Sequence, residues 1–353
     1  MAGCPDASFP PSRVADSSFF MPDESAPHGC TWMAFRASPD IWGRKYSRDV
    51  QDDLARIAKA IARYEPVKML VRAEDYAVAL AKCGTNVELI VTELLDDLWI
   101  RDTGPAFVIN AEGQRAGIDF NFNGWGNKQT HDRDAQVAQF VSEQAQVPVI
   151  KTKLVLEGGG IEVDGRGTAL IAESCILNDN RNPGWTKLDC ETELKALLGL
   201  RKIIWLPGIR GADITDGHTD FYVRFARPGV VIAGYDPDPK SPDHEVTKRH
   251  LEILKSQTDA DGNSLQVVVL EGPRRIRSGY DWEEFAAGYI NFYVVNGAVI
   301  MPEFGDRKAD RNARKVLEGL YSERDIIQLN IDNIAAGGGG IHCTTQQQPL
   351  VRN

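Results

Sequence analysis

The four consecutive glycines Gly337 to Gly340 are followed by Ile341, His342 and Cys343. Because glycine has no Cβ atom, such a run lets the backbone pass close to another group. The thiolate form of cysteine is a strong nucleophile. This stretch therefore predicts a reactive thiol beside bare backbone. A flexible C-terminal turn that carries a buried, inert cysteine is the alternative for the stretch taken alone.

The polar residues that could work with this thiol each come just before a short apolar stretch or the hairpin that leads to one. They are Asp102 in WIRDTGP, Glu157 before three glycines, His218 and Asp220 in DGHTDF, and Asn291 in YINFY. If these segments are equivalent parts of one fold, a thiol, an imidazole, three carboxylates and an amide should converge on one site.

The acid–base chemistry of such a site follows from the residue types. A cysteine needs a base or an electropositive setting before it can attack, and His218 is the better partner for Cys343. His342 is adjacent in sequence but would point to the opposite face of a strand. Glu157 would orient and charge the imidazole, as the acid of a nucleophile–base–acid triad does. The other histidines, His28, His131, His244 and His250, are expected at the surface.

Asp102 and Asp220 remain without a role in the acid–base work. Two carboxylates beside a Cys–His pair suit a planar cation with several donors. A guanidinium that carries one substituent has five N–H groups and pairs bidentately with carboxylates. Trp99, three residues before Asp102, is interpreted as a core or cavity-wall residue.

Recurring elements would have to position these residues. A glycine followed by a short apolar strand occurs at residues 104–109, 167–172, 229–234 and 297–302, at intervals of 63, 62 and 68. Amphipathic helices are predicted at 134–144, 189–198, 244–256 and 306–320. Strands at 30–35, 68–71 and 87–92, with helices at 49–64 and 73–83, precede them. About five mixed units fit the chain. This pattern predicts a closed, propeller-like α/β ring with one central channel.

Bulk properties exclude several classes of protein. The chain has 353 residues, 42% of them hydrophobic, and a formal net charge of −10. It has no polybasic run, which disfavours nucleic-acid and anionic-membrane partners, and no run of 18 apolar residues that would predict a membrane span. Six scattered cysteines favour free thiols in a reducing, cytoplasmic setting over disulfides or a zinc site. We expect residues 1–20 to be a flexible arm with no secretory signal, and 21–353 to form a single catalytic domain.

The motifs together resemble the agmatine deiminase family of the guanidine-modifying pentein superfamily. They are residues 99–105, 122–126, 157–160, 217–220, 291–293 and 337–349. The resemblance implies a five-bladed ββαβ propeller with pseudo-fivefold symmetry around an active-site channel. It further implies one role for each matching residue: Cys343 as nucleophile, His218 as general acid and base, Glu157 as its acidic partner, Asp102 and Asp220 as guanidinium ligands, Trp99 as a wall of the site and Asn291 as a substrate-binding amide.

The activity implied is hydrolysis of agmatine to N-carbamoylputrescine and ammonia, a reaction of putrescine biosynthesis, through an S-alkylthiouronium on Cys343. A small cationic guanidine would be the partner, no metal or organic cofactor is expected, and a homodimer is left open. Two departures concern the substrate: Gly340, where the family often has Asn, and Ile214, where an acidic residue is common. Such an acidic residue could receive the distal amine of the substrate, and Asp213 or Asp216 could serve in its place.

Three alternatives stay open. A deiminase of free or peptidyl arginine would need arginines that clamp a carboxylate, and residues 120–128 offer no convincing equivalent. An amidinotransferase would use the same Cys–His pair but pass the amidino group to an amine. A non-catalytic binding protein of the same fold is the third.

Overall fold

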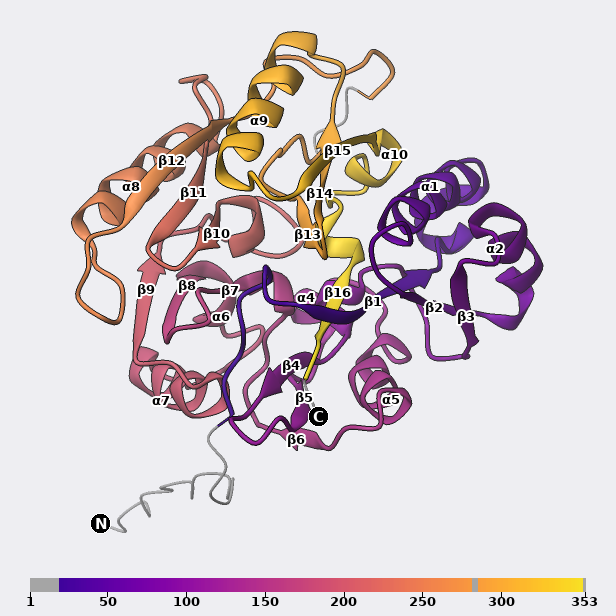
Figure 1. Ribbon diagram of the computed structural model, residues 1–353, viewed down its shortest axis with the longest axis horizontal. Helices are drawn as coiled ribbons and strands as arrows, with labels where there is room; N and C mark the ends of the chain where they lie inside the picture. The colour runs from indigo at the N-terminus through magenta and orange to yellow at the C-terminus, as the bar shows by residue number, and fades with distance from the viewer. Residues whose placement is uncertain (1–18, 281–284, 352–353) are drawn as a thin grey trace, which may run out of the picture.

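The computed structural model describes residues 19–280 and 285–351, and it has a mixed α/β architecture (Figure 1). Within the described residues the strands form five sheets, four of which are three-stranded. In each of these four, an antiparallel hairpin is followed by a strand parallel to its second member. Their strands are β4 (Ala106–Ile109), β5 (Arg115–Asp119) and β6 (Val149–Lys151); β7 (Ile161–Val163), β8 (Thr168–Ala172) and β9 (Lys202–Leu206); β10 (Val223–Arg227), β11 (Val230–Tyr235) and β12 (Gln266–Glu271); β13 (Tyr293–Val295), β14 (Ala298–Glu303) and β15 (Asp325–Asn330).

The remaining sheet joins the two ends of the chain. Its strand order is β16 (Gln346–Pro349), β1 (His28–Phe35), β2 (Val67–Val71) and β3 (Val87–Val91). β16 pairs antiparallel with β1, with Thr31 opposite Gln347, and β1, β2 and β3 run parallel. In Figure 1 the five sheets follow one another around the molecule in chain order, and the longer helices lie at the periphery. The C-terminal strand thus returns to the N-terminal sheet.

The connecting helices cover sheet faces that would otherwise expose apolar side chains. The middle strand β14 buries the apolar residues 298–301 on both faces, as a strand with covered faces does. The largest apolar cluster packs Leu54 of α1 and Leu317 of α9 around this strand. The longer helices are α1 (Pro39–Ile61), α2 (Tyr76–Cys83), α5 (Val137–Gln144), α7 (Lys187–Leu198), α8 (Asp243–Ser256) and α9 (Arg307–Leu320).

Local signals explain where these helices begin and end. Thr186 and Asp189 form a capping box at the start of α7, and Gly199 ends it in the left-handed conformation with φ 65°, the usual residue for that position. α1 begins ten residues before the predicted position because Ser38 caps it and Pro39 occupies its first turn. Gly43, with φ 73°, interrupts this helix near its start.

The predicted strands are confirmed, but one of their equivalences is wrong. The apolar stretches at 167–172, 229–234 and 297–302 are the middle strands β8, β11 and β14 of their sheets. The stretch at 104–109 is instead β4, the first strand of its sheet, and β5 is the equivalent middle strand. β5 was missed because Arg115 and Gly117 interrupt its apolar character.

Two histidines predicted at the surface are buried. His28 is hydrogen-bonded to Glu65 and to the carbonyl of Glu24, and His250 contacts the carbonyl of Pro207. The predicted arm, residues 1–20, lies outside the described residues up to residue 18, and Phe20 already forms a backbone bridge with Ile109. None of the helices in the described ranges is long and apolar enough to cross a bilayer.

Candidate active site

Short helical turns lie directly before an edge strand in four of the five sheets, and the predicted site residues stand in these turns or immediately before them. They are α3 (Ile100–Thr103) before β4, the 3-10 turn Gly158–Gly160 before β7, the turn Thr219–Phe221 before β10, and the turn His342–Thr344 before β16. Asn291 occupies the corresponding place just before β13. Because all of these turns precede equivalent strands, the predicted residues come from five sheets and meet inside the molecule, where all are buried: Asp102, Glu157, His218, Asp220, Asn291 and Cys343.

The thiol of Cys343 contacts the amide of Asn291 and the carboxylate of Asp220. Its Sγ atom lies 3.3 Å from Asn291 Nδ2 and 3.6 Å from Asp220 Oδ2. Asn291 Oδ1 also accepts a hydrogen bond from the backbone N–H of His342 at 3.0 Å. A Cβ atom on Gly340 would lie 2.4 Å from the same oxygen. The glycine at this position therefore leaves room for Asn291 beside the thiol.

The imidazole of His218 lies between two acids. Its Nε2 atom is 3.1 Å from Glu157 Oε2, and its Nδ1 atom is 3.7 Å from Asp102 Oδ2. Within the described chain no hydrogen bond joins His218 to Cys343 directly. The predicted Cys–His pair is thus present as two groups that flank the Asp102 and Asp220 carboxylates.

Arg181 is a residue of this site that the sequence reasoning missed. Its Nε atom donates to both carboxylate oxygens of Glu157, at 2.8 and 3.1 Å, and its Nη1 atom donates to Asp216 at 2.9 Å. Burial alone would raise the pKa of Glu157, but Arg181 and the hydrogen bond with His218 hold it below its usual value. Glu157 is therefore an ionised partner for the imidazole.

Asp102 is fixed by two donors from other segments. Gly159 N–H donates to Oδ1 at 3.0 Å, and the indole Nε1–H of Trp125 donates to Oδ2 at 2.9 Å. Trp125 stands in a turn, α4 (Gly124–Asn127), in which all four residues have positive φ, 54° at Trp125 itself. Such a conformation costs free energy at a bulky residue. The motif at 122–126 contains Trp125, but no local pattern in the sequence predicts its hydrogen bond with Asp102.

Asp220 makes its principal contact with His342. The two are joined by a 2.7 Å hydrogen bond between Asp220 Oδ2 and His342 Nδ1. Asp220 Oδ1 is buried and has no hydrogen-bond partner among the described residues. The expectation that His342 points away from the site is wrong, because the segment is a 3-10 turn and not a strand. His342 instead lies directly behind the carboxylate that contacts Cys343.

The charges around the thiol favour a cation. Burial, followed by Asp220 and Asp102, raises the pKa of Cys343 well above its usual value. Burial alone would lower the pKa of His218, but Asp102 and Glu157 raise it to about 9. Burial also raises the pKa of Asp102, and the bond to His342 outweighs burial in lowering that of Asp220. A positive ligand between Asp102 and Asp220 would favour the thiolate.

The glycine run packs against aromatic side chains. A Cβ atom on Gly339 would lie 2.1 Å from the ring of Trp99, and one on Gly337 would lie 2.0 Å from that of Trp42. The two indoles contact one another, with their centroids 5.9 Å apart. Bare backbone is therefore required here to admit Trp99, which is buried, as the sequence predicted for a core or wall residue.

Asp213 and Asp216, the two acids suggested in place of Ile214, differ in whether their carboxylates are free to bind a ligand. Asp216 is buried and engaged by Arg181, by Lys128 at 2.7 Å and by Asn180 at 3.1 Å, and these contacts outweigh burial in lowering its pKa to about 2. Asp216 is therefore already paired with donors of the chain itself. Asp213 is exposed in the same loop, and its Oδ1 accepts from Thr215 N–H at 2.6 Å.

Comparison with known proteins assigns the chain to a family. A model of the Porphyromonas-type peptidyl-arginine deiminases matches residues 20–349. The chain belongs to this family. One similar protein is agmatine deiminase from Stutzerimonas stutzeri, which is 38% identical over 360 residues, 96% of this chain and 97% of that protein. This relative supports the family assignment over nearly the whole chain.

Solved structures of similar proteins agree with the family assignment. Agmatine deiminase of Enterococcus faecalis has a TM-score of 0.89 and 33% identity, and the match covers 96% of this chain and 99% of that one. A substrate-bound cysteine-to-serine variant of agmatine deiminase from C. jejuni has a TM-score of 0.85 and 25% identity, over 97% and 99% of the two chains. The mixed α/β architecture is thus shared with these members of the family.

Proposed function

We propose that the protein is a cysteine-dependent agmatine deiminase that hydrolyses agmatine to N-carbamoylputrescine and ammonia. The observation that carries this proposal is the convergence of Cys343 with two buried carboxylates, Asp102 and Asp220. Sγ contacts Asp220, and Asp220 Oδ1 has no hydrogen-bond partner in the described chain. A guanidinium supplies the donors that such oxygens need. The names of the similar proteins support agmatine as the guanidine.

In the first half-reaction the substrate's guanidinium is held by Asp102 and Asp220, with its central carbon over Sγ of Cys343. Its positive charge offsets the two carboxylates that raise the pKa of the thiol, so the thiol releases its proton to solvent and the thiolate adds to the carbon. The product of this step is a tetrahedral adduct. His218, which carries a proton below about pH 9, protonates one –NH2 group. Ammonia leaves, and an S-alkylthiouronium remains on Cys343.

In the second half-reaction the neutral imidazole of His218 takes a proton from water. The hydroxide adds to the thiouronium carbon, and the C–S bond then breaks with its electron pair passing to the thiolate. The added hydroxyl loses its proton to solvent, and the ureido product leaves while His218 keeps the proton taken from water as the imidazolium. Glu157, held by Arg181, stabilises the imidazolium in both halves. Asn291 donates to Sγ, and Trp99 forms a wall of the site. No step draws on a group outside the chain, the substrate and water.

The distal ammonium of agmatine requires a partner beyond the guanidinium site. Asp213 is the proposed partner, since it lies in the loop that leads into His218 and its carboxylate is exposed. The side chain of Ile214 carries no charge. Its backbone carbonyl accepts a hydrogen bond from Lys128 Nζ at 3.0 Å, which joins this loop to the segment that follows Trp125.

The five-sheet arrangement supports the finer description of the fold as a five-bladed ββαβ propeller, with one catalytic domain from residue 21 onward. Each three-stranded sheet has the same strand directions, and β16 returns to β1.

We extend the proposal to a cytoplasmic location, supported by five buried free thiols among the described residues. A homodimer is proposed as the assembly, supported by exposed apolar side chains on the outer strands, Val91 and Val269.

Ammonia release from a panel of guanidines tests the proposed substrate. Agmatine, free arginine and an arginine-containing peptide are compared at equal concentration, with and without an added primary amine. We expect agmatine to have a kcat/KM at least about a hundredfold above that of arginine, because arginine adds an uncompensated carboxylate to an acidic site. Faster release from arginine or the peptide would reassign the substrate. An amidino product formed at the expense of the ureido product would indicate an amidinotransferase.

A further inference from the structure

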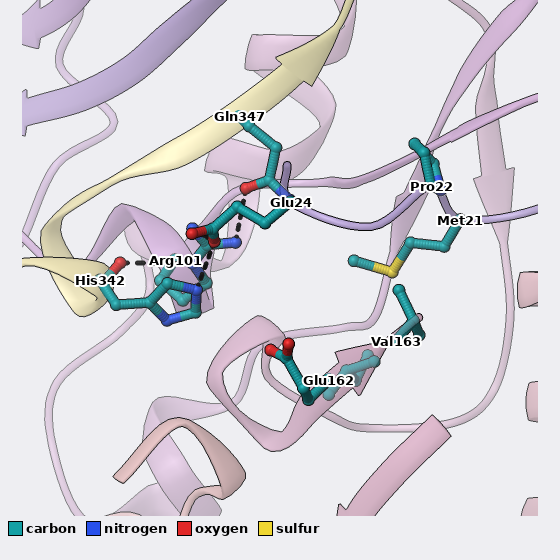
Figure 2. Close-up of a pocket in the computed structure, with 9 residues that line it drawn as sticks. Met21, Pro22, Glu24, Arg101, Glu162, Val163, His342 and Gln347 are labelled. Carbon is teal, nitrogen blue, oxygen red and sulfur yellow. Dashed lines mark hydrogen bonds and ion pairs between the residues drawn. The ribbon is translucent and has the colours of Figure 1, made fainter. Parts of the chain in front are cut away.

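A buried chain of alternating charges lies directly behind Asp220. The ring of His342 stands between two carboxylates: Nδ1 is 2.7 Å from Asp220 Oδ2, and Nε2 is 2.8 Å from Glu24 Oε2. Figure 2 shows His342 and Glu24 joined at a small pocket that Arg101 and Glu162 also line. All three members of the chain are buried, and Asp220 is 0% exposed. The imidazole therefore links a carboxylate of the proposed site to one behind it.

Glu24 is itself held by cations from two other segments. Arg224 lies 2.7 Å from its Oε1 atom, Arg101 donates to Oε2 at 3.3 Å, and Val294 N–H donates to Oε1 at 2.8 Å. Burial alone would raise the pKa of Glu24, but Arg224, His342 and Arg101 hold it well below its usual value. Glu24 is thus an anchored carboxylate, and the cations around it are paired: Arg224 also binds Glu162 at 2.8 Å.

Both ring nitrogens of His342 donate hydrogen bonds to its two carboxylate partners. Two ionised carboxylates supply no proton, so both short hydrogen bonds use hydrogens of the ring. Charge-assisted bonds of this kind are stronger than neutral ones. With both ring nitrogens engaged, His342 has no lone pair for the thiol of Cys343, although it is the adjacent residue. A direct role as the base for the thiol is therefore excluded by this geometry.

We propose that His342 is a positioning residue that holds Oδ2 of Asp220, so that Oδ1 stays free for the substrate's guanidinium, and that Glu24 fixes His342 in turn. This inference rests on the proposed role of Asp220 in guanidinium binding. Without the bond, the Asp220 carboxylate is free to turn within the site and meets the repulsion of Asp102 without compensation. The buried, partnerless Oδ1 is what a bound cation would satisfy.

Two substitutions of His342 separate its contacts. The amide of asparagine reaches about as far as Nδ1, so His342→Asn keeps a donor for Asp220. The amide of glutamine reaches about as far as Nε2, so His342→Gln keeps a donor for Glu24 and loses the bond to Asp220. Both remove a buried ring, and each serves as the control for the other.

The probe is the rate at which Cys343 is alkylated by 2-chloroacetamidine, divided by the rate with neutral 2-chloroacetamide. The two reagents share their reactive carbon, but the amidinium presents charged N–H groups like those of a guanidinium. The ratio of the rates reports cation capture beside Sγ and cancels changes in thiol reactivity or in the folded fraction. It does not depend on which guanidine is the natural substrate.

We expect Asp220→Asn and His342→Gln each to lower this ratio about tenfold or more, the scale of a lost hydrogen bond to a charged group. The double variant should be no lower than Asp220→Asn alone, because residues that act through one another are not additive. His342→Asn should retain more of the ratio than His342→Gln. Multiplied effects in the double variant, an unchanged ratio in His342→Gln, or equal losses in the two His342 variants would overturn the inference.

Ammonia assays on the same proteins separate this inference from the proposed function. If the wild-type protein releases no ammonia from agmatine but the ratios follow the expected pattern, the substrate is wrong and the role of His342 stands. If ammonia is released but the pattern is missing, the function stands and His342 has no positioning role. A wild-type Cys343 that shows no preference for the amidine would refute both.

Discussion

Replacing Cys343 by serine should abolish ammonia release from agmatine and leave the fold intact. The hydroxyl matches the thiol in shape but is far less acidic, so no nucleophile forms between Asp102 and Asp220. We expect kcat to fall by at least about a thousandfold, the scale of losing a covalent nucleophile. Steady-state ammonia assays measure the activity, and the thermal unfolding midpoint reports the fold.

Cys190→Ser is the matched control for this substitution. Cys190 is buried in α7 and contributes to the cluster of apolar side chains around β8. Its replacement also adds a hydroxyl to the interior, but in a different apolar cluster from the one that contains the proposed nucleophile. We expect this variant to keep its ammonia release. A Cys343→Ser protein with wild-type activity would remove the thiol from the mechanism.

Replacing His218 by glutamine should have the second-largest effect. His218 donates the proton on which ammonia leaves, and general acid–base catalysis contributes about a hundredfold to ten-thousandfold. In the wild-type protein kcat/KM should fall as the pH rises through about 9, the pKa to which Asp102 and Glu157 raise this buried imidazole. The rate falls with rising pH because the acid is the protonated imidazole, which is present only below that pH.

His250→Gln controls for the loss of a buried histidine. His250 is fully buried in α8, where its ring contacts Tyr222 and the carbonyl of Pro207. We expect this variant to keep both the rate and the alkaline limb of the pH profile. The account of His218 would be refuted by a His218→Gln protein within tenfold of wild type, or by an alkaline limb that persists unchanged in it.

The sequence was sufficient for the residues that stand at recurring places in the chain. Asp102, Glu157, His218, Asn291 and Cys343 each precede an edge strand of a sheet, so a repeat of glycines and apolar stretches predicts their convergence. The same repeat was a less reliable guide to which strands are equivalent in the fold. β4 was equated with the middle strands of the other sheets, because Arg115 and Gly117 disguised β5.

The supporting residues could not be predicted because their partners lie far away in the chain. Glu24 and His342 are 318 positions apart, and Arg181 lies in an irregular loop 24 residues from Glu157. Neither pair has a fixed spacing or a local pattern. The position of His342 differs from the prediction for another reason. The side chains of a strand alternate in direction, which would turn His342 away from the site, whereas the 3-10 turn of this segment brings it behind Asp220.

Gly340 illustrates a departure that only the packing explains. The position tolerates no Cβ while Asn291 keeps its place, since the two would be 2.4 Å apart. Asn291 in turn contacts both Cys343 and the backbone of His342. The glycine therefore belongs to the arrangement around the thiol.

The central claim is that agmatine is deiminated through a covalent bond to Cys343. It is tested most directly by mass spectrometry of the Cys343 peptide after the enzyme is mixed with saturating agmatine and quenched in acid within the first turnover. The account predicts an adduct on this peptide equal in mass to agmatine less ammonia, formed as the first ammonia is released and absent from Cys343→Ser. Ammonia release at the wild-type rate with Cys343 unmodified throughout the first turnover would contradict it.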